Sequence, residues 1–420
     1  MTPRLRILNI THVLPDRSLA AAYSPPPPPP LPDDGLVELS FMEALFVDRA
    51  MPMRRLFFYE GPGVPPFPSL NGSLRSSLAA ALAVFPPLSG KLAHRPSSGG
   101  GVDVVVDCSP AAVSPGVRFV EAEYGGGIAD MRRVASGSDG GDTEALMELG
   151  PELDATQLPA PVLTVQVTRP AVGAGGGGGR AVGSPPSRDV ADLAPPAFDR
   201  TPLRYPEADE LACKILRTVA PALPVIRSSE EPDTPPSTYL AVSSLIWTSI
   251  ARAKSGDDLA GDGDAYFLVA VDFRRRLGPP IDDRYFGDCV VPCVARAVVH
   301  DLRGDIGLAC AAAAIRDAIR AQPEDPVRAM EAWLEALREV VPCSCSCRER
   351  FRFTGSSNRF MAYEMDFGWG KPSKVELVLL LGADDGGVQV TATLRPEHMD
   401  AFASNLARFS RSGNDGYPNC

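Results

Sequence analysis

Four histidines are the side chains of this chain best suited to accept a proton at neutral pH. An imidazole with an ordinary pKa of about 6.5 can serve as a general base that takes the proton of a reacting hydroxyl group. His94 stands between basic residues and is expected at the surface, His300 precedes a predicted loop over 301–304, and His398 falls on the last predicted helix. We assign none of these three residues to chemistry.

The fourth histidine, His12, is followed by Asp16, so the two residues match a His-x-x-x-Asp pattern. Three of the five positions in this pattern are free, and such a pattern arises easily by chance. It also begins on a predicted strand over 4–14 and contains Pro15. We therefore interpret His12 and Asp16 as a chance match without a catalytic role.

The string Asp366-Phe367-Gly368-Trp369-Gly370 is the most distinctive pattern in the chain. Its glycines allow tight backbone turns and the close approach of another segment. The aspartate could cap or brace such a loop through its carboxylate. The residues alone therefore predict a turn between two elements.

Nine cysteines, an odd number, are scattered over 420 residues. This distribution favours reduced thiols over a disulfide framework. Cys343, Cys345 and Cys347 alternate with serine, whereas zinc ligands are usually spaced as Cys-x-x-Cys with a second pair elsewhere. We interpret the cluster as a loop and expect no metal site.

The charge of the chain restricts its partners. A net charge of −11 and a pI near 5.0 argue against nucleic acid, which requires a basic face. An anionic cofactor is still compatible, because a local basic patch can lie on an acidic protein. No apolar run is long enough for a signal peptide or a membrane span, so we expect a cytoplasmic protein without a membrane partner.

Strands and helices alternate along the chain. Strands are predicted over 4–14, 102–106, 162–168, 266–273, 375–381 and 388–394, and helices over 73–85, 239–254, 307–320, 327–340 and 396–409. The proline run 25–30 and the Gly/Pro/Ser-rich segment 173–196 are expected to be linkers. Gly175 to Gly179 lack the Lys-Ser or Lys-Thr that follows a phosphate-binding loop. The alternation predicts an α/β protein with two domains of similar size.

Several of these strings together resemble the BAHD family of plant acyl-CoA-dependent acyltransferases. The DFGWG string of residues 366–370 is a hallmark of that family, and the segments 74–92, 161–169 and 394–402 are similar to family blocks. The segment Tyr285-Phe286-Gly287-Asp288-Cys289 resembles the Tyr-Phe-Gly-Asn-Cys box of flavonoid and anthocyanin glycoside acyltransferases, with Asp288 in place of asparagine.

The resemblance implies two α/β domains of the chloramphenicol-acetyltransferase type, each a mixed sheet with flanking helices. It places an N-terminal domain at 1–183, a linker at 184–234 and a C-terminal domain carrying DFGWG at 235–420. It also implies an enzyme that moves a malonyl or hydroxycinnamoyl group from acyl-CoA, such as malonyl-CoA, to a hydroxyl of a phenolic glycoside. No bound cofactor is expected, and we expect a monomer.

The chain departs from the family at the catalytic motif. The family carries His-x-x-x-Asp shortly after the strand that 161–169 resembles, and its histidine is the general base. Here the sequence passes from Ala181-Val182-Gly183 directly to Ser184-Pro185-Pro186, without a histidine nearby. We therefore expect the N-terminal domain to be incomplete and activity to be impaired. Alternatives are a non-catalytic relative that binds CoA or a partner, and the product of an incomplete gene model.

Arg274 and Arg276 are the remaining candidates. They alternate within Val271-Asp272-Phe273-Arg274-Arg275-Arg276-Leu277, so on a strand both would share one face. In the family an arginine of this block is thought to pair with the aspartate of the catalytic motif. Without that aspartate, either arginine could lack its partner, attract the phosphates of CoA, or be solvated.

Overall fold

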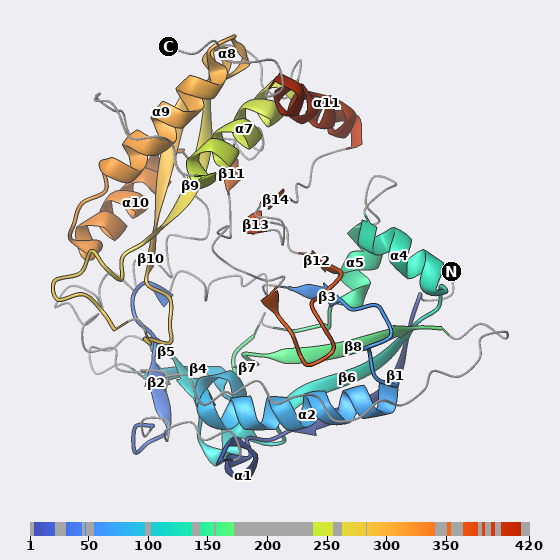
Figure 1. Ribbon diagram of the computed structural model, residues 1–420. Helices are drawn as coiled ribbons and strands as arrows, with labels where there is room; N and C mark the ends of the chain where they lie inside the picture. The colour runs from blue at the N-terminus through green and yellow to red at the C-terminus, as the bar shows by residue number, and fades with distance from the viewer. Residues whose placement is uncertain are drawn as a thin grey trace. The chain divides into compact units, whose positions relative to one another are not determined.

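The computed structural model describes residues 4–21, 31–43, 47, 54–96, 102–136, 143–154, 157–171, 238–254, 263–282, 284–340, 351–353, 364–376, 380–382, 388–390 and 396–412 (Figure 1). Two compact α/β units are present. Unit 1 consists of Met1–Cys213, Ile281–Asp288 and Ala362–Leu377, and unit 2 of Lys214–Pro280, Cys289–Met361 and Val378–Cys420. Neither unit is continuous in sequence. The segment that carries DFGWG belongs to unit 1, although the sequence placed it with the C-terminal domain, and the expected linker 184–234 lies outside the described residues.

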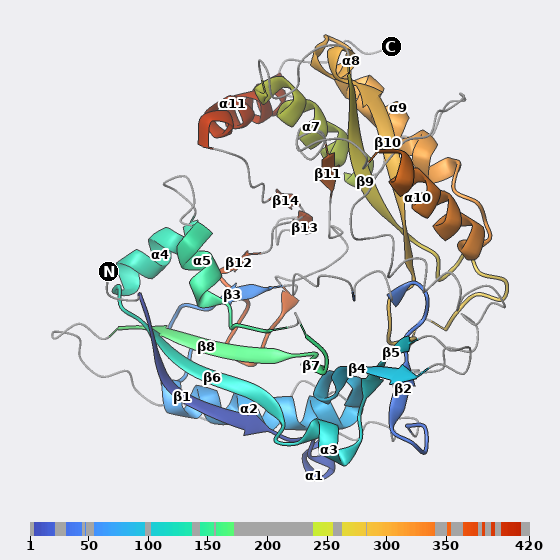
Figure 2. The ribbon, with the colours of Figure 1, turned by 180° about the vertical axis from the view of Figure 1, so that it is seen from behind.

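Unit 1 is built on a three-stranded sheet in the order β1-β6-β8. Strand β6 (Val117–Tyr124) pairs antiparallel with β1 (Leu5–Val13) and parallel with β8 (Thr164–Pro170). The helix α2 (Phe67–Val84) runs along this sheet in Figure 2, and Leu82 packs with Phe119 in the core. Burial of these apolar side chains between helix and sheet supplies the main stabilisation of this layer.

Helix α2 is longer than the sequence predicted. It starts at Phe67, directly after Pro66, and has a proline within its first two positions, where a missing backbone N–H costs no hydrogen bond. It ends before Pro86 and Pro87, which form the short 3-10 turn η2 (Pro86–Ser89). The prolines therefore set both ends of the helix.

A second sheet of unit 1 has the order β2-β5-β4-β7. It contains β2 (Leu36–Glu38), β5 (Val102–Asp107), β4 (Lys91–Pro96) and β7 (Ala160–Pro161), and its pairs are antiparallel. The short helices of this unit are α1 (Arg17–Ala21), α3 (Pro110–Val113), α4 (Ile128–Ser136) and α5 (Thr143–Leu149). A third pairing joins distant parts of the chain, because β3 (Leu56–Phe58) is antiparallel to β12 (Lys374–Glu376).

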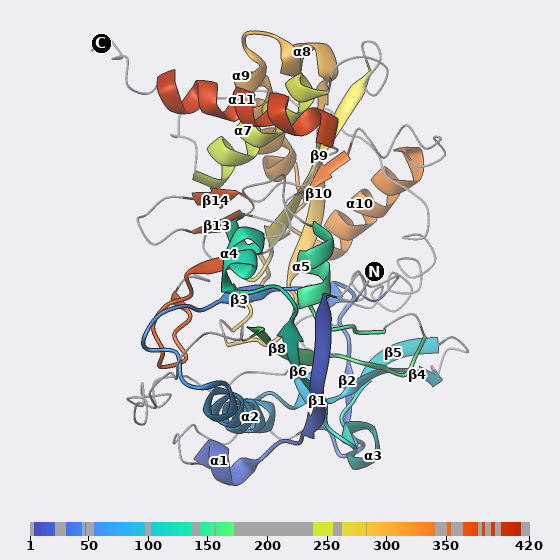
Figure 3. The ribbon, with the colours of Figure 1, turned by 90° about the vertical axis from the view of Figure 1, so that its right-hand side faces the viewer.

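Unit 2 contains the sheet β10-β9-β11. Strand β9 (Asp264–Asp272) is antiparallel to β10 (Val290–Val298) and parallel to β11 (Phe351–Phe353). The helices are α7 (Thr238–Ala253), α8 (Val299–Arg303), α9 (Gly307–Arg320), α10 (Pro326–Val340) and α11 (Pro396–Ser412), and a separate pair joins β13 (Leu380–Gly382) to β14 (Val388–Val390). Helix α7 packs beside α11 (Figure 3), where Ile246 and Phe402 share one apolar cluster.

Most predicted elements are confirmed to within a few residues. The main exceptions lie at 375–381 and 301–304. The predicted strand over 375–381 is represented by two short strands in different sheets, β12 and β13. His300 lies inside α8, with the expected loop over 301–304 largely helical. No helix in the described ranges has both the length and the apolar character needed to cross a bilayer.

Candidate functional site

The DFGWG loop is organised around one carboxylate oxygen. Oδ1 of Asp366 accepts hydrogen bonds from the backbone N–H groups of Gly368 at 2.7 Å, Trp369 at 3.0 Å and Gly370 at 3.0 Å. Gly368 and Gly370 have φ angles of 87° and 93°, a region that residues with a Cβ rarely adopt. The bracing expected of Asp366 is thus observed, and both glycines are required by the backbone path.

Tyr59, just after β3, anchors this loop in unit 1. Its ring lies edge-on to Phe367 and Trp369, with centroid distances of 5.8 and 5.5 Å. Its hydroxyl donates to the carbonyl of Met365 at 3.1 Å. Burial, followed by the negative charge of Asp366, raises the pKa of Tyr59 to about 12. The phenol therefore stays protonated and keeps donating, which suits a structural role.

Strand pairing completes the attachment. The backbone N–H and the hydroxyl of Ser373 both donate to the carbonyl of Phe58, at 2.7 and 3.0 Å. Lys371 also forms an ion pair with Glu364 across the loop at 3.1 Å. No local sequence signal identified Tyr59 or Phe58 as partners of residues some three hundred positions away, because strand pairing at this separation leaves no short-range pattern.

Within the box from Tyr285 to Cys289 the chain passes from unit 1 to unit 2, between Asp288 and Cys289. Tyr285 and Cys289 are buried, Phe286 packs on Phe85 with ring centroids 5.0 Å apart, and Asp288 is exposed. The backbone N–H of Phe273 donates to the carbonyl of Cys289 at 2.8 Å, directly before β10 begins. The box therefore delivers the chain from a loop into a buried strand.

Gly287 has no room for a side chain. A Cβ at this position would lie 2.5 Å from Oε1 of Glu43 and 2.6 Å from the hydroxyl oxygen of Tyr285. Glu43 itself accepts from the backbone N–H of Ser40 at 2.7 Å, while the Ser40 hydroxyl accepts from the N–H of Glu43 at 3.2 Å. This reciprocal Ser-x-x-Glu pattern was visible in the sequence and could have drawn attention to Glu43.

The expectation that Arg274 and Arg276 share a strand face is wrong. Strand β9 ends at Asp272, whose Oδ1 accepts the backbone N–H of Arg274 at 3.0 Å and so turns the chain out of the sheet. Arg274 also pairs with Asp272 through its guanidinium at 3.3 Å. Arg276 is exposed and stacks over the Phe273 ring at 5.5 Å. Neither is a buried orphan cation.

The four histidines occupy separate elements. His12 on β1 and His94 on β4 are exposed, as is His300 on α8, whereas His398 is buried on α11. Asp16 lies beyond the end of β1, where its Oδ1 accepts the N–H and hydroxyl of Ser18 at 2.8 and 2.6 Å. These hydrogen bonds lower the pKa of Asp16, led by the Ser18 hydroxyl, and cap α1. Asp16 thus has a structural explanation that does not involve His12.

Four of the cysteines lie within the described part of the chain. Cys108, Cys289, Cys293 and Cys310 are free thiols. In the described ranges no group of three or more His, Cys, Asp or Glu side chains is arranged to hold a metal ion. Cys343, Cys345 and Cys347, the proline run 25–30, the glycine run 175–179 and the position of the missing motif after Gly183 lie outside the described residues.

Comparison with known proteins identifies the family. The family model described as "Transferase family" matches residues 27–192 and 223–408. The chain belongs to this family, the BAHD transferases, which confirms the resemblance drawn from DFGWG.

Two curated relatives illustrate how much of the chain such alignments cover. The malonyl-coenzyme:anthocyanin 5-O-glucoside-6'''-O-malonyltransferase of Salvia splendens is 28% identical over 50% of this chain and 51% of its own length. The shikimate O-hydroxycinnamoyltransferase of Nicotiana tabacum is 25% identical over 84% of this chain and 91% of its own length. For the Salvia relative, the alignment spans about half of the enzyme.

Solved structures show the same fold. Vinorine synthase superposes with a TM-score of 0.63 at 16% identity, covering 96% of this chain and 98% of that one. TRI101 of F. sporotrichioides, solved with coenzyme A and T-2, gives a TM-score of 0.51 at 17% identity, with coverage of 89% and 98%. The two-domain α/β fold of the chloramphenicol-acetyltransferase type is therefore established.

Proposed function

We propose that this chain is an acyl-CoA-dependent O-acyltransferase in which catalysis is severely impaired. The intended reaction is transfer of a malonyl or hydroxycinnamoyl group from CoA to a hydroxyl of a phenolic glycoside. Family membership and relatives named for anthocyanin and phenolic glucoside malonyl transfer support this assignment. A reducing location such as the cytoplasm fits the free thiols, and we expect a monomer.

The placement of the histidines is the observation that supports the proposed loss of acyltransferase activity. In the reaction the acceptor oxygen attacks the thioester carbonyl, the hydroxyl proton passes to a base, and the CoA thiolate leaves. Three of the four histidines are exposed on separate elements of the structure, and the family position after residue 183 has none. Without a positioned base the proton must pass to water, which costs about a hundredfold to ten-thousandfold in rate.

Restoring the missing segment tests this proposal. The His-x-x-x-Asp segment of the Salvia relative would be inserted after Gly183, and turnover of malonyl-CoA with flavonoid glucosides would be followed by CoA release and product mass. We expect at least a hundredfold gain, and no gain when the inserted histidine is replaced by alanine. Comparable turnover by the unmodified chain would overturn the proposal, and His12→Ala would then identify the base.

The absence of the His-x-x-x-Asp motif after Gly183 also favours a second function. A relative that binds CoA without transferring the acyl group needs the fold but no base. Arg276, whose guanidinium is exposed, is a candidate contact for CoA phosphates because guanidinium groups suit phosphate oxygens. Calorimetric titration of CoA into the unmodified chain and into Arg276→Ala tests this function. Sequencing the transcript across the codon for Gly183 decides between a real gap and an incomplete gene model.

A further inference from the structure

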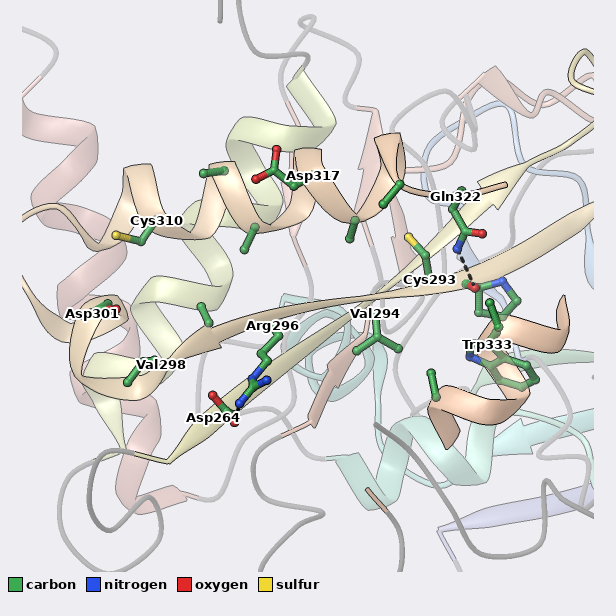
Figure 4. Close-up of a pocket in the computed structure, with 18 of the residues that line it drawn as sticks. Asp264, Cys293, Val294, Arg296, Val298, Asp301, Cys310, Asp317, Gln322 and Trp333 are labelled. Carbon is green, nitrogen blue, oxygen red and sulfur yellow. Dashed lines mark hydrogen bonds and ion pairs between the residues drawn. The ribbon is translucent and has the colours of Figure 1, made fainter. Parts of the chain in front are cut away.

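A groove of about 410 Å³ lies in unit 2 between β10, α9 and α10 (Figure 4). One wall is a single face of α9, as the helical spacing of its members shows. That face consists of Cys310, Ala313, Ala314, Asp317 and Ala318, and the C-cap residue Ala321 extends it. Four alanines on one face leave space between the helix and the strand that larger side chains would fill. The size lies within the usual range of small-molecule sites.

One part of the groove is apolar and aromatic. It is formed by Pro292 and Val294 of β10 and by Ala332, Trp333 and Ala336 of α10. Trp333 is only 8% exposed, and its indole N–H has no hydrogen-bond partner among the described residues. In Figure 4 the Trp333 ring lies at the opposite end of the labelled residues from Asp301. A flat apolar or aromatic group can pack against this part of the groove.

The other part of the groove carries an excess of negative charge. Three carboxylates, those of Asp264, Asp301 and Asp317, and one guanidinium, that of Arg296, are among its lining residues. Arg296 is engaged with Asp264. Asp317 meets Arg316 only at 3.9 Å. Burial, followed by the charge of Asp301, raises the pKa of the neighbouring Cys310 thiol. Asp301 and Asp317 therefore give the groove a negative potential that disfavours anions.

We propose that this groove binds a small amphiphilic cation, a primary ammonium joined by a short chain to an aromatic ring. The ammonium lies toward Asp301 and Asp317, and the ring packs on the alanine face of α9 toward Trp333. Charge complementarity selects the cation, and apolar burial supplies most of the affinity. This binding involves no covalent step and does not depend on acyltransferase activity.

Three probes with one skeleton test the charge preference. Calorimetric titrations of the full chain would use 4-phenylbutylammonium, the neutral 4-phenylbutanol and the anionic 4-phenylbutyrate. We expect the ammonium to bind about threefold to tenfold more tightly than the alcohol, as weak partly solvated ion pairs allow, and butyrate to bind more weakly still. Equal affinities for ammonium and butyrate, or no binding by the ammonium, would overturn the proposal.

Variants locate the site. Asp301→Asn with Asp317→Asn should remove the preference for ammonium over alcohol, whereas Asp305→Asn, an exposed carboxylate outside the groove, should preserve it. Ala314→Phe should abolish binding of both the ammonium and the alcohol, because the larger side chain fills the groove. Thermal melting checks that each variant folds, and Ala318→Leu, a smaller filling, replaces Ala314→Phe if the latter does not. Unchanged binding in the filled variant, or an unchanged preference in the double variant, would contradict this location.

Discussion

The two glycine-containing motifs of this chain need their glycines for opposite reasons. Gly370 in the DFGWG loop has a positive φ of 93°, while a Cβ there would meet nothing within 4 Å. Gly287 in the Tyr-Phe-Gly-Asp-Cys box is not in that φ region, yet a Cβ would overlap Glu43 and Tyr285. One motif is restricted by its backbone and the other by its neighbours. Similar strings in a sequence can therefore encode different physical constraints.

Gly287→Ala should have the largest effect on this comparison. The added methyl group must displace the Tyr285 hydroxyl and the Glu43 carboxylate, and we expect a loss of about 1–3 kcal/mol in the free energy of unfolding. Chemical denaturation measures this loss. Tyr285→Phe in the same chain removes the crowding oxygen and should recover part of it. An unaffected Gly287→Ala variant would show that the box is not sterically restricted.

Asp366→Ala should have the second largest effect on stability. It removes the oxygen that accepts three backbone N–H groups, so we expect a loss of about 1–2 kcal/mol, similar to the loss of a strong helix cap. Asp366→Asn keeps an acceptor oxygen and should lose less. The measurement is again denaturation, with hydrogen exchange of the Gly368, Trp369 and Gly370 amides as a local readout. Equal effects of the two substitutions would place the importance in charge and not in loop geometry.

Gly370→Ala isolates the contribution of the backbone conformation to stability. Open space surrounds this position, so the expected loss of about 1 kcal/mol comes from the left-handed conformation alone. Gly278 is the matched control, because it also has nothing within 4 Å of a Cβ and its φ is not in the positive region. Gly278→Ala should leave the denaturation midpoint nearly unchanged. Similar losses at both glycines would refute the backbone explanation.

The smallest expected effect is on the pH dependence of stability and comes from Asp282, just before the box that begins at Tyr285. The Arg284 side chain, followed by the Arg284 backbone N–H, lowers the pKa of Asp282 from 3.8 to about 2. A lowered folded-state pKa means that its contribution to stability is present above pH of about 4 and is lost as pH falls through about 2. Carboxyl NMR should place the Asp282 midpoint near 2, and Arg284→Gln should raise it. A midpoint near 3.8 in the unmodified chain would contradict the pairing.

Local patterns in the sequence were enough to predict many elements, because hydrophobic periodicity and prolines act over a few residues. Helix α9 was predicted over its observed range, and α10 to within one residue. Strands β6 and β10 were not predicted, although the alternation in 117–124 gave a usable signal. The prediction that Arg274 lies on a strand is wrong, because a single side chain, that of Asp272, caps the turn that follows β9.

Predictions for the site succeeded where the interaction is local and failed where it is distant. The role of Asp366 as a brace could be expected, since it bonds residues two to four positions ahead. The contacts of Tyr59 with Phe367 and of Glu43 with Gly287 depend on tertiary packing, which no spacing rule reports. The assignment of 281–288 and 362–377 to unit 1 was missed for the same reason.

The pairing of β3 with β12 has a consequence for synthesis on the ribosome. Phe58 and Ser373 are 315 positions apart in the chain. At a translation rate of about 5–20 residues per second, β3 emerges about 15 to 60 s before its partner strand has been made. During that interval the nascent N-terminal unit presents Leu56 and Phe57 without their partner strand β12, and Tyr59 without the DFGWG loop that contacts it in the finished protein. Chaperones that bind short apolar segments should therefore engage this stretch of the nascent chain and be released once residue 376 has left the exit tunnel.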